Sequence, residues 1–451
     1  METLLKKALQ EADVDYLQIV IEERRRTQIE YSGPQLEGIG TTIDRGGNVR
    51  ACHRGGWGFV SFTDLSDLRG YVKEACRQAK MVGGEKTTLA HLTGEEANIR
   101  PHFEIDPQAI PLEEKENLIR RYNQIILSFP KIQTSRAIYR DLKIDQYIGT
   151  SEGRLIHQEK LYTGASLRAT AKEGTNVQQV LESVGQTKGF EVVKGLEEKA
   201  EAVARDAVEL LSAPKVTPGL YTVILDPKLA GVFTHEAFGH LSEADFLSEN
   251  PSFKEKMRLG DRFGPDELSI VDDATLPQEN GSFGYDEEGV PAQKTYLIKD
   301  GILVGRLHSR ETAALMGEEP TGNARAISYL FPPLVRMSNT FIESRDYDFE
   351  RMVSEVPDGI YAVDMLGGNT DLEMFTFSAQ KAYRIVKGKI KGMIRDVVLS
   401  GNVFDTLKRI DAIGNDLLLS GGLGGCGKGR QFPLPVSDGS PHLRIKGVLI
   451  G

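Results

Sequence analysis

Two histidines and a glutamate lie close together near the middle of the chain, in the segment His235-Glu236-Ala-Phe-Gly-His240. Two imidazoles can hold a divalent metal ion, and a neighbouring carboxylate can accept a proton from a water bound to that ion. His235 and His240 are therefore candidate metal ligands, and Glu236 is the candidate general base. This combination of residues is typical of zinc-dependent hydrolases.

The spacing of the two histidines is unusual. Familiar zinc hydrolases place their histidines four residues apart, which separates the rings by about 40° around an α-helix. A spacing of five separates them by about 140° in a regular helix. We therefore predict a π-bulge between His235 and His240, and Gly239 is the residue best able to relax into it. The alternative is an amphipathic helix that carries these side chains without a common ligand.

The flanking residues favour a metal site. Residues 221–225 read as a buried strand, and Asp226-Pro227 is a typical helix start. Glu243 and Asp245 follow His240 by about one turn. They are candidates for hydrogen bonds that orient the histidine rings.

A glycine-rich stretch near the C-terminus, residues 420–429, contains the candidate third ligand. It nearly spells a phosphate-binding loop, but Lys428 is followed by Gly429 instead of Ser or Thr, and no helix pattern follows. Cys426 lies between glycines in this stretch. A catalytic zinc site uses three protein ligands and leaves a position for water, which favours Cys426 beside the two histidines. The alternative is an inert thiol in a turn.

Composition limits the function classes. The chain has 451 residues and a formal net charge of −10, which argues against a general nucleic-acid or anionic membrane surface. No apolar run reaches the roughly 18 residues that cross a bilayer, and the N-terminus lacks the order of a signal peptide. Three scattered cysteines do not form a disulfide framework. We expect a cytoplasmic protein without nucleic-acid or membrane partners.

The pattern of strands, helices and turns predicts an α+β protein. Proline and glycine between residues 213 and 219 divide it into an α/β domain with a mixed or antiparallel sheet (residues 1–214) and a largely β domain that carries the metal helix (residues 215–451). Residues 83–108 read as a linker or covering loop. Residues 246–285 are poor in periodicity, which predicts a lid or binding loop.

Three consecutive arginines, Arg24 to Arg26, interrupt a strand pattern near the N-terminus. Such a run could bind an anion. A solvated hairpin end between two strands is the interpretation that we favour.

The sequence resembles the TldD/TldE family, whose second member is also called PmbA. The resemblance extends along the whole chain and is carried by the His235-Glu236-x-x-Gly239-His240 motif, Cys426, Val271-Asp-Asp273, Asp286-Glu-Glu-Gly289, Pro320-Thr-Gly-Asn-Ala-Arg325 and Arg336-Met-Ser-Asn-Thr340. The same histidine spacing occurs in the dipeptidyl-peptidase III zinc enzymes. The older family label, modulator of DNA gyrase, implies a link to DNA that the acidic composition does not support.

The resemblance implies a function. TldD-like subunits are zinc metallopeptidases that act on unfolded or flexible peptides, whereas TldE-like subunits share the fold, lack the histidine motif and pair with them. Because this chain keeps all four motif residues, the resemblance implies the catalytic subunit, as a homodimer or as a heterodimer with a TldE-like subunit. It also implies an N-terminal α/β domain followed by a largely β domain with the metal.

The expected chemistry is metal-assisted hydrolysis of a peptide bond. Zn²⁺ polarises the scissile carbonyl and a bound water, and Glu236 moves the proton to the leaving amine. The peptide is expected to add as a strand to an edge of the C-terminal sheet. His308, Arg325 and Arg336 are candidates for the oxyanion donor. The rival hypothesis is a silent partner or binding module with a structural metal closed by four ligands, in which Glu236 is dispensable.

Overall fold

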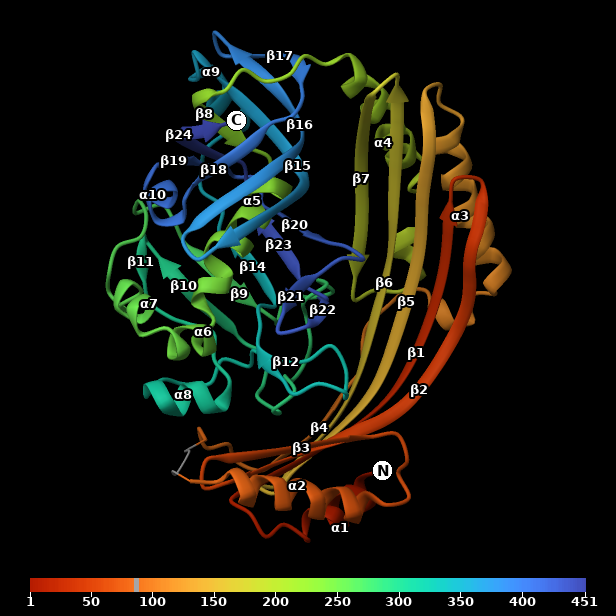
Figure 1. Ribbon diagram of the computed structural model, residues 1–451, viewed down its shortest axis with the longest axis vertical. Coiled ribbons are helices and arrows are strands. Elements are labelled where there is room, and N and C mark those ends of the chain that lie inside the picture. The colour runs from red at the N-terminus through yellow and green to blue at the C-terminus, as the bar shows by residue number, and fades with distance from the viewer. Residues whose placement is uncertain (85–88) are drawn as a thin grey trace.

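The first half of the chain is built on one large sheet (Figure 1). The computed structural model describes residues 1–84 and 89–451. The sheet is seven-stranded, in the order β3-β2-β1-β5-β6, and both β4 and β7 pair with β6. Its strands are β1 (Tyr16–Ser32), β2 (Gln35–His53), β3 (Gly56–Phe62), β4 (Glu95–Ile99), β5 (Ile132–Thr150), β6 (Arg154–Glu173) and β7 (Asn176–Gln186). All pairs are antiparallel except β4 with β6, so the sheet is mixed.

Side chains alternate between the two faces of a strand, and here the apolar ones lie on one face, which is the face that helices cover. On β1, Ile19 and Ile21 pack in one apolar cluster and Ile29 and Tyr31 in another. The helices that cover these clusters are α1 (Glu2–Leu9), α2 (Leu68–Val82), α3 (Leu112–Leu127) and α4 (Glu197–Ser212). The opposite face of β1 is polar and lies toward the second half of the chain, as Figure 1 shows.

The second half contains a β-barrel. Its five closing strands are β8 (Gly219–Leu225), β15 (Asp358–Asp371), β16 (Met374–Val386), β18 (Val398–Asn402) and β24 (Leu443–Ile450). Direct pairing of β15 with β16 completes the circle. Two further strands extend it, β17 (Lys389–Ile394) on β16 and β19 (Ile410–Ile413) on β24.

A six-stranded sheet lies beside the barrel, in the order β11-β10-β9-β14-β23-β20. These strands are β9 (Ile270–Asp273), β10 (Lys294–Lys299), β11 (Ile302–Leu303), β14 (Asn339–Ile342), β20 (Leu418–Gly421) and β23 (Ser437–Ser440). Two short ladders complete the β structure: β12 (Ala324–Arg325) with β13 (Leu334–Val335), and β21 (Cys426–Lys428) with β22 (Gln431–Leu434).

The central helix of this half is α5 (Pro227–Thr234), which contacts both the barrel strand β15 and the strands β14, β20 and β23 of the second sheet. Phe233 packs edge-on against Phe375 and Phe377 of the barrel. The remaining helices are α6 (Ala244–Glu249), α7 (Pro251–Lys256), α8 (Arg310–Met316), α9 (Phe349–Ser354) and α10 (Val403–Lys408). Among the described residues, no helix is both long and apolar enough to cross a membrane.

The predicted α+β fold is confirmed, whereas the division at residues 214 and 215 stays a prediction. The hairpin end predicted at Arg24 to Arg26 is wrong, because β1 continues through it without a break. Glu23 and Arg25 are exposed on the face that carries Ile21 and Ile29, between the two apolar clusters. The polar residues 22–28 therefore follow one another without a break, which imitates a turn signal in sequence.

Two segments predicted to be loops contain regular structure. Residues 246–285 hold a helix and the strand β9, which lies inside the six-stranded sheet and is fully buried. Its acids, Asp272 and Asp273, made this segment look solvated. Residues 83–108 include the strand β4, which pairs with β6. Residues 85–88 of that predicted linker lie outside the described residues.

Candidate metal centre

The helix that begins as α5 changes its winding at the histidines. Residues His235–Gly239 form a π-helix, in which the backbone N–H of His240 donates to the carbonyl of His235. A short 3₁₀ turn, His240–Ser242, follows. A turn closed over five residues returns His240 to the side of the helix that carries His235. The predicted π-bulge is confirmed.

Gly239 has a different role from the one predicted. Its backbone is ordinary right-handed helix (φ −57°, ψ −54°), so the π-turn does not require glycine for its conformation. The need is for space: a Cβ on Gly239 would lie 2.0 Å from the sulfur of the buried Met337. The absent side chain lets the π-turn pack closely against the residue that precedes β14.

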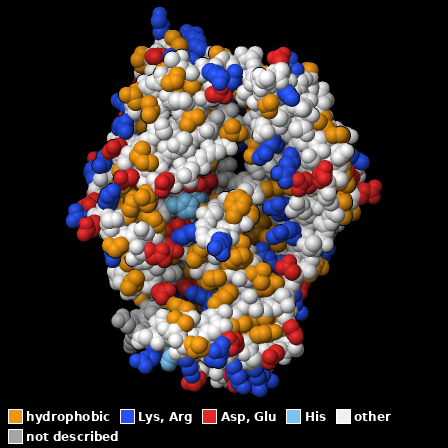
Figure 2. Space-filling model, viewed as in Figure 1, with side chains coloured by type: hydrophobic (Ala, Val, Ile, Leu, Met, Phe, Trp, Pro, Cys, Tyr) orange, Lys and Arg blue, Asp and Glu red, His pale blue; other side chains and the backbone are white. Residues whose placement is uncertain are grey.

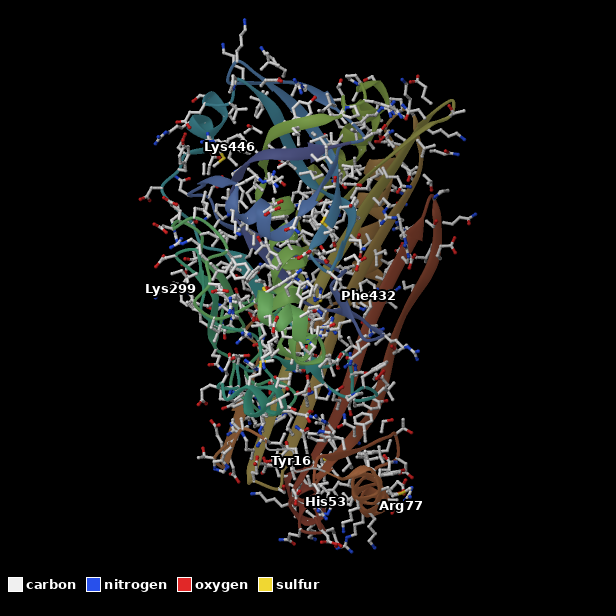
Figure 3. The ribbon with its side chains drawn as sticks, turned by 60° about the vertical axis from the view of Figure 1, so that its left-hand side comes forward. Tyr16, His53, Arg77, Lys299, Phe432 and Lys446 are labelled. Carbon is white, nitrogen blue, oxygen red and sulfur yellow. The ribbon has the colours of Figure 1, made fainter. Side chains whose placement is uncertain are left out.

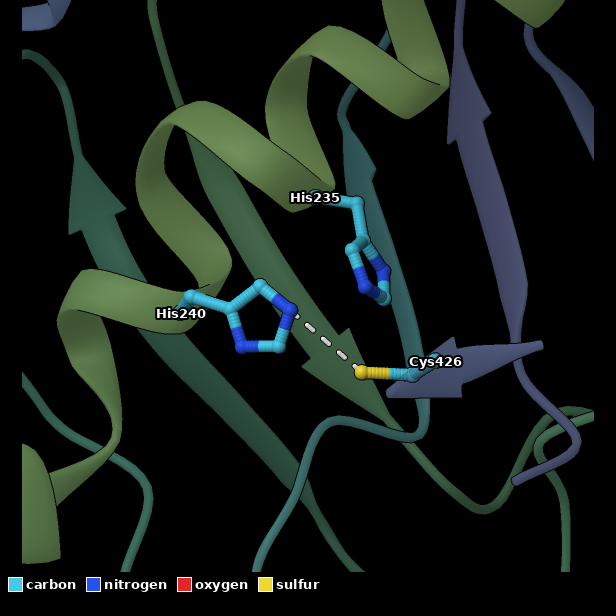
Figure 4. Close-up of side chains that lie close together, drawn as sticks. All are labelled: His235, His240 and Cys426. Atoms are coloured by element: carbon cyan, nitrogen blue, oxygen red, sulfur yellow. Dashed lines mark hydrogen bonds between the residues drawn. The ribbon is translucent and has the colours of Figure 1, made fainter. Parts of the chain in front are cut away.

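The structure brings the two predicted histidines together with Cys426, as Figure 4 shows. One ligand atom from each of the three side chains lies within 4.8 Å of the other two. The Sγ of Cys426 is 3.4 Å from Nε2 of His240, and the two imidazole rings are nearly perpendicular, with centroids 5.1 Å apart. Ligands on adjacent corners of a zinc tetrahedron are about 3.5 Å apart, given Zn–N and Zn–S bonds of about 2.0 and 2.3 Å. The donor set and its size fit Zn²⁺.

The three side chains polarise one another. Burial alone would raise the pKa of Cys426, but the two histidines lower it to about 5, which favours the thiolate that binds metals. Burial would lower the pKa of His240, but Glu243 and Cys426 raise it to about 10. The pKa of His235 is likewise raised well above its usual value, against the effect of burial, by Asp438 and Cys426.

Glu243 supports His240 from behind. Its Oε2 accepts from Nδ1 of His240 at 3.1 Å and from Nζ of Lys428 at 2.8 Å. Lys428 also donates to Asp245 at 2.7 Å and to the carbonyl of Val335 at 2.9 Å. Burial would raise the pKa of Glu243, but His240 and Lys428 hold it at about 2. Glu243 therefore contacts a ring directly, as predicted, whereas Asp245 acts on it only through Lys428.

Asp438 is a site residue that the sequence did not reveal. Its Oδ1 lies 2.7 Å from Nδ1 of His235, an ion-pair distance at an angle outside hydrogen-bond geometry. Asp438 belongs to β23. Helix α5 can approach that strand closely because Gly231 has no side chain: a Cβ there would lie 2.8 Å from the backbone nitrogen of Gly439. Lys428 was also missed, although its spacing of two from Cys426 on a strand places both side chains on one face.

Glu236 follows His235 directly on the π-helix and is half-buried. Unlike Glu243, it forms no ion pair or side-chain hydrogen bond within residues 1–84 and 89–451. Its role as the general base stays a prediction.

Of the three candidates for the oxyanion donor, Arg336 is the one whose side chain contacts a candidate metal ligand in the described part of the chain. His308 is occupied elsewhere, by Thr312 and Glu318. Arg325 donates to the carbonyls of Met337 and Pro435. Arg336 is fully buried and donates from Nη2 to the carbonyl of Cys426 at 2.7 Å, and its Nε and Nη1 have no partner within the described part of the chain.

Comparisons with known proteins agree with this geometry. Residues 218–451 match the family model of the PmbA/TldA metallopeptidase C-terminal domain, residues 105–213 match its central domain, and residues 17–79 match its domain 1. A metalloprotease of Synechocystis sp. is 44% identical over 98% of this chain and 96% of its own length. The chain belongs to the PmbA/TldD metallopeptidase family. A zinc metalloprotease TldD homolog of Saccharolobus solfataricus is 28% identical over 98% of this chain and 96% of its own length.

Solved structures of the PmbA/TldD fold extend over the whole chain. A Thermotoga maritima protein superposes with a TM-score of 0.82 at 19% identity and covers 100% of both chains. TldE from Thermococcus kodakarensis superposes with a TM-score of 0.76 at 16% identity, over 100% of this chain and 99% of its own. At these identities the likeness establishes the PmbA/TldD fold and leaves the chemistry to the residues of each site.

Removal of Cys426 tests the donor set. We expect Cys426→Ala and Cys426→Ser to lower zinc affinity sharply, because each removes the thiolate that faces both histidines. Cys52→Ala and Cys76→Ala are matched controls, since both thiols are buried in the N-terminal half. The measurement is the zinc content of each variant after dialysis, determined by mass spectrometry of the metal. Equal zinc in all four variants would place the third ligand elsewhere, with Glu243 the first alternative.

The pKa shifts give zinc binding a direction with pH. Because the pKa of both histidines is raised, protons compete with a metal ion for the two rings. We expect zinc binding to release protons near neutral pH, and zinc affinity to fall as pH is lowered. Calorimetry in buffers of different ionisation enthalpy measures the release. Asp438→Asn removes a carboxylate that raises the pKa of His235, so this variant should release fewer protons when it binds zinc. An affinity that is constant from about pH 6 to 8 would contradict this linkage.

Proposed function

We propose that the chain is a zinc-dependent peptidase, the TldD-like catalytic subunit of its family, with His235, His240 and Cys426 as the zinc ligands. The observation that carries the proposal is the meeting of these three donors. Two histidines come together through a π-turn, and the cysteine arrives from 186 residues further along the chain. The metalloprotease names of the relatives support the same reaction class.

The residues of this chain have separate tasks in the reaction. Bound zinc supplies Lewis acidity toward the scissile carbonyl and lowers the pKa of an attacking water. Glu236 accepts the proton of that water and returns it to the leaving amine. Glu243 and Asp438 fix the orientation of the two imidazole rings. Arg336 holds the backbone of Cys426 and places positive charge behind the thiolate.

The proposed substrates are unfolded or flexible peptides. An extended peptide binds through main-chain hydrogen bonds when it adds to the edge of a strand, with little dependence on its sequence. The strand that carries Cys426, β21, pairs only with β22 among the described strands. Its outer edge is therefore the position next to the metal centre at which we propose that a peptide binds.

Exchange of Glu236 for glutamine separates the enzyme from the silent binding module. In the enzyme, Glu236→Gln should lower kcat on an unstructured fluorogenic peptide by about 10²-fold or more, because the base is lost. Zinc content should not change. Glu249→Gln, on the exposed surface of α6, is the control and should leave both unchanged. Full activity of Glu236→Gln with zinc retained would favour a different mechanism, and no activity in the unaltered zinc-loaded protein would favour the binding module.

The assembly is the second testable part of the proposal. A peptidase that we place in the cytoplasm must exclude folded proteins, and enclosure of the metal in a dimer achieves this. We expect a homodimer, or a heterodimer with a TldE-like subunit, with an interface well above about 1,000 Å². Light scattering and digestion of one protein in its folded and unfolded forms provide the measurements. A monomer that cleaves both forms at similar rates would refute this part.

A further inference from the structure

A cavity of about 480 Å³ lies between the polar face of the N-terminal sheet and the β21–β22 hairpin. Its charged lining is predominantly basic in a chain whose net charge is −10. The cationic residues in the lining are Arg24, Arg26, Arg140, Lys160 and Arg325, and the acidic ones are Glu22, Asp44 and Glu287. Figure 2 shows Lys and Arg side chains gathered beside the hollow between the two halves.

Most of these charges already have partners. Arg24 pairs with Glu22 at 3.0 Å, and Lys160 pairs with Glu287 at 3.1 Å. Arg325 uses its guanidinium on two backbone carbonyls, those of Met337 and Pro435. The cations that remain are Arg26 on β1 and Arg140 on β5.

Arg26 and Arg140 lie side by side without an acidic partner. They occupy the same face of adjacent strands, since Arg26 is opposite Leu142 and Arg140 is opposite Gln28. Neither forms an ion pair with any acid in residues 1–84 or 89–451. Arg140 donates from Nη2 to Oε1 of Gln28 at 3.3 Å, and its Nε is buried without a hydrogen-bond partner. Burial lowers the pKa of both groups, as does the charge of Arg24 on Arg26 and of Arg26 on Arg140, whereas Asp44 and Glu30 partly offset this lowering. Two such guanidinium groups attract an anion.

The cavity and the candidate metal centre share a wall, the β21–β22 hairpin. Gly424 lines the cavity and lies two residues before Cys426, and Leu434 lines it and pairs with Cys426 across the hairpin. Phe432, in strand β22 of this hairpin, lines the cavity and is 65% exposed. Figure 3 shows it between the second half of the chain and the long strands of the sheet. An exposed aromatic ring beside two arginines is a typical contact surface for peptides.

We propose that Arg26 and Arg140 bind a carboxylate of the peptide substrate, so that acidic peptides are preferred. The carboxylate comes either from the C-terminus of the peptide or from an Asp or Glu side chain, because the paired donors of guanidinium groups fit both. The inference rests on the proposed function in one respect, that the ligand is a peptide. It adds a selecting site on the far side of the hairpin that carries the third metal ligand.

A peptide suits this cavity better than a nucleic acid. A nucleic acid needs a basic surface that follows several phosphates, whereas here the basic charge is confined to a recess in an acidic chain. Arg24 and Lys160 are already paired with Glu22 and Glu287, so they add little attraction for a polyanion. A single carboxylate needs only the two unpaired arginines.

Binding of labelled unstructured peptides by fluorescence anisotropy tests the assignment. The full-length chain carries Glu236→Gln and excess zinc, so that the measurement does not depend on hydrolysis. Four peptides of one length are compared: with and without glutamates (replaced by glutamine), and each with a free or an amidated C-terminus. Arg26→Gln and Arg140→Gln are tested beside Arg25→Gln, the neighbouring arginine whose exposed side chain points to the other face of β1.

We expect Arg26→Gln and Arg140→Gln to weaken binding of the acidic free-acid peptide at least about tenfold, since each loses a charge-assisted hydrogen bond. Arg25→Gln should change it little. If amidation of the C-terminus makes binding independent of Arg26 and Arg140, the carboxylate is the C-terminal one. If removal of the glutamates does so, the carboxylate is a glutamate side chain. Equal binding of all four peptides, or an equal loss in Arg25→Gln, would overturn the site.

An oligonucleotide and the hydrolysis rate provide two further results that bear on this site. A single-stranded oligonucleotide whose binding requires Arg26 and Arg140, while the peptides bind independently of them, would show that the peptide assignment is wrong. Arginine-dependent peptide binding with no hydrolysis by the zinc-loaded native chain would refute the proposed peptidase and leave the carboxylate site standing. Thermal melts of each variant confirm that it is folded, and the comparison among peptides on the native arginines holds even if a variant is not.

Discussion

Two side chains five residues apart on one helix reach a common ion only if the helix accepts an additional residue in its turn. The π-turn at His235–Gly239 meets this condition, and its surroundings hold it in place. Phe233 and Phe238 are fully buried on either side of His235, which contributes about 1.5–3 kcal/mol each. The barrel, the second sheet and Met337 thus offset the cost of a rare helix form. Every other contact of the metal centre depends on this turn.

The charges around the site alternate in sign along one chain of contacts. Lys428 touches Glu243, Glu243 touches His240, and both histidines face Cys426, while Asp438 ends the chain at His235. A buried charge left without its partner costs about 3–5 kcal/mol, so each member stabilises the next. A Zn²⁺ ion that displaced one proton from each histidine would leave the net charge of these side chains unchanged. The same outer acids therefore serve the protein with and without metal.

The sequence was sufficient for the local parts of the site. The His235–His240 spacing predicted the π-turn, because helix geometry is fixed by local hydrogen bonds. The glycine-rich stretch near the C-terminus drew attention to Cys426, whose thiol lies beside both histidines. Asp438 could not be found in this way, since its meeting with His235 depends on the packing of α5 against β23. The arginines of β1 were misread because the face that carries Ile21 and Ile29 is itself polar at Glu23 and Arg25, so the alternation breaks off between the two apolar clusters. The opposite face of β1 is largely polar and is covered by the second half of the chain.

That covered polar face also explains why the cavity lies where it does. Residues 286–288 of the second half dock on one end of the sheet and supply the acids that it lacks: Glu288 pairs with Arg50 at 3.1 Å and Glu287 with Lys160 at 3.1 Å. Burial and Glu288 raise the pKa of Asp286 to about 8, and three backbone N–H groups hold it in place. Matched charges exclude water and join the halves at that end. Further along the sheet no acid of the described second half pairs with Arg26 or Arg140, and the cavity separates the two halves beside the hairpin that carries Cys426.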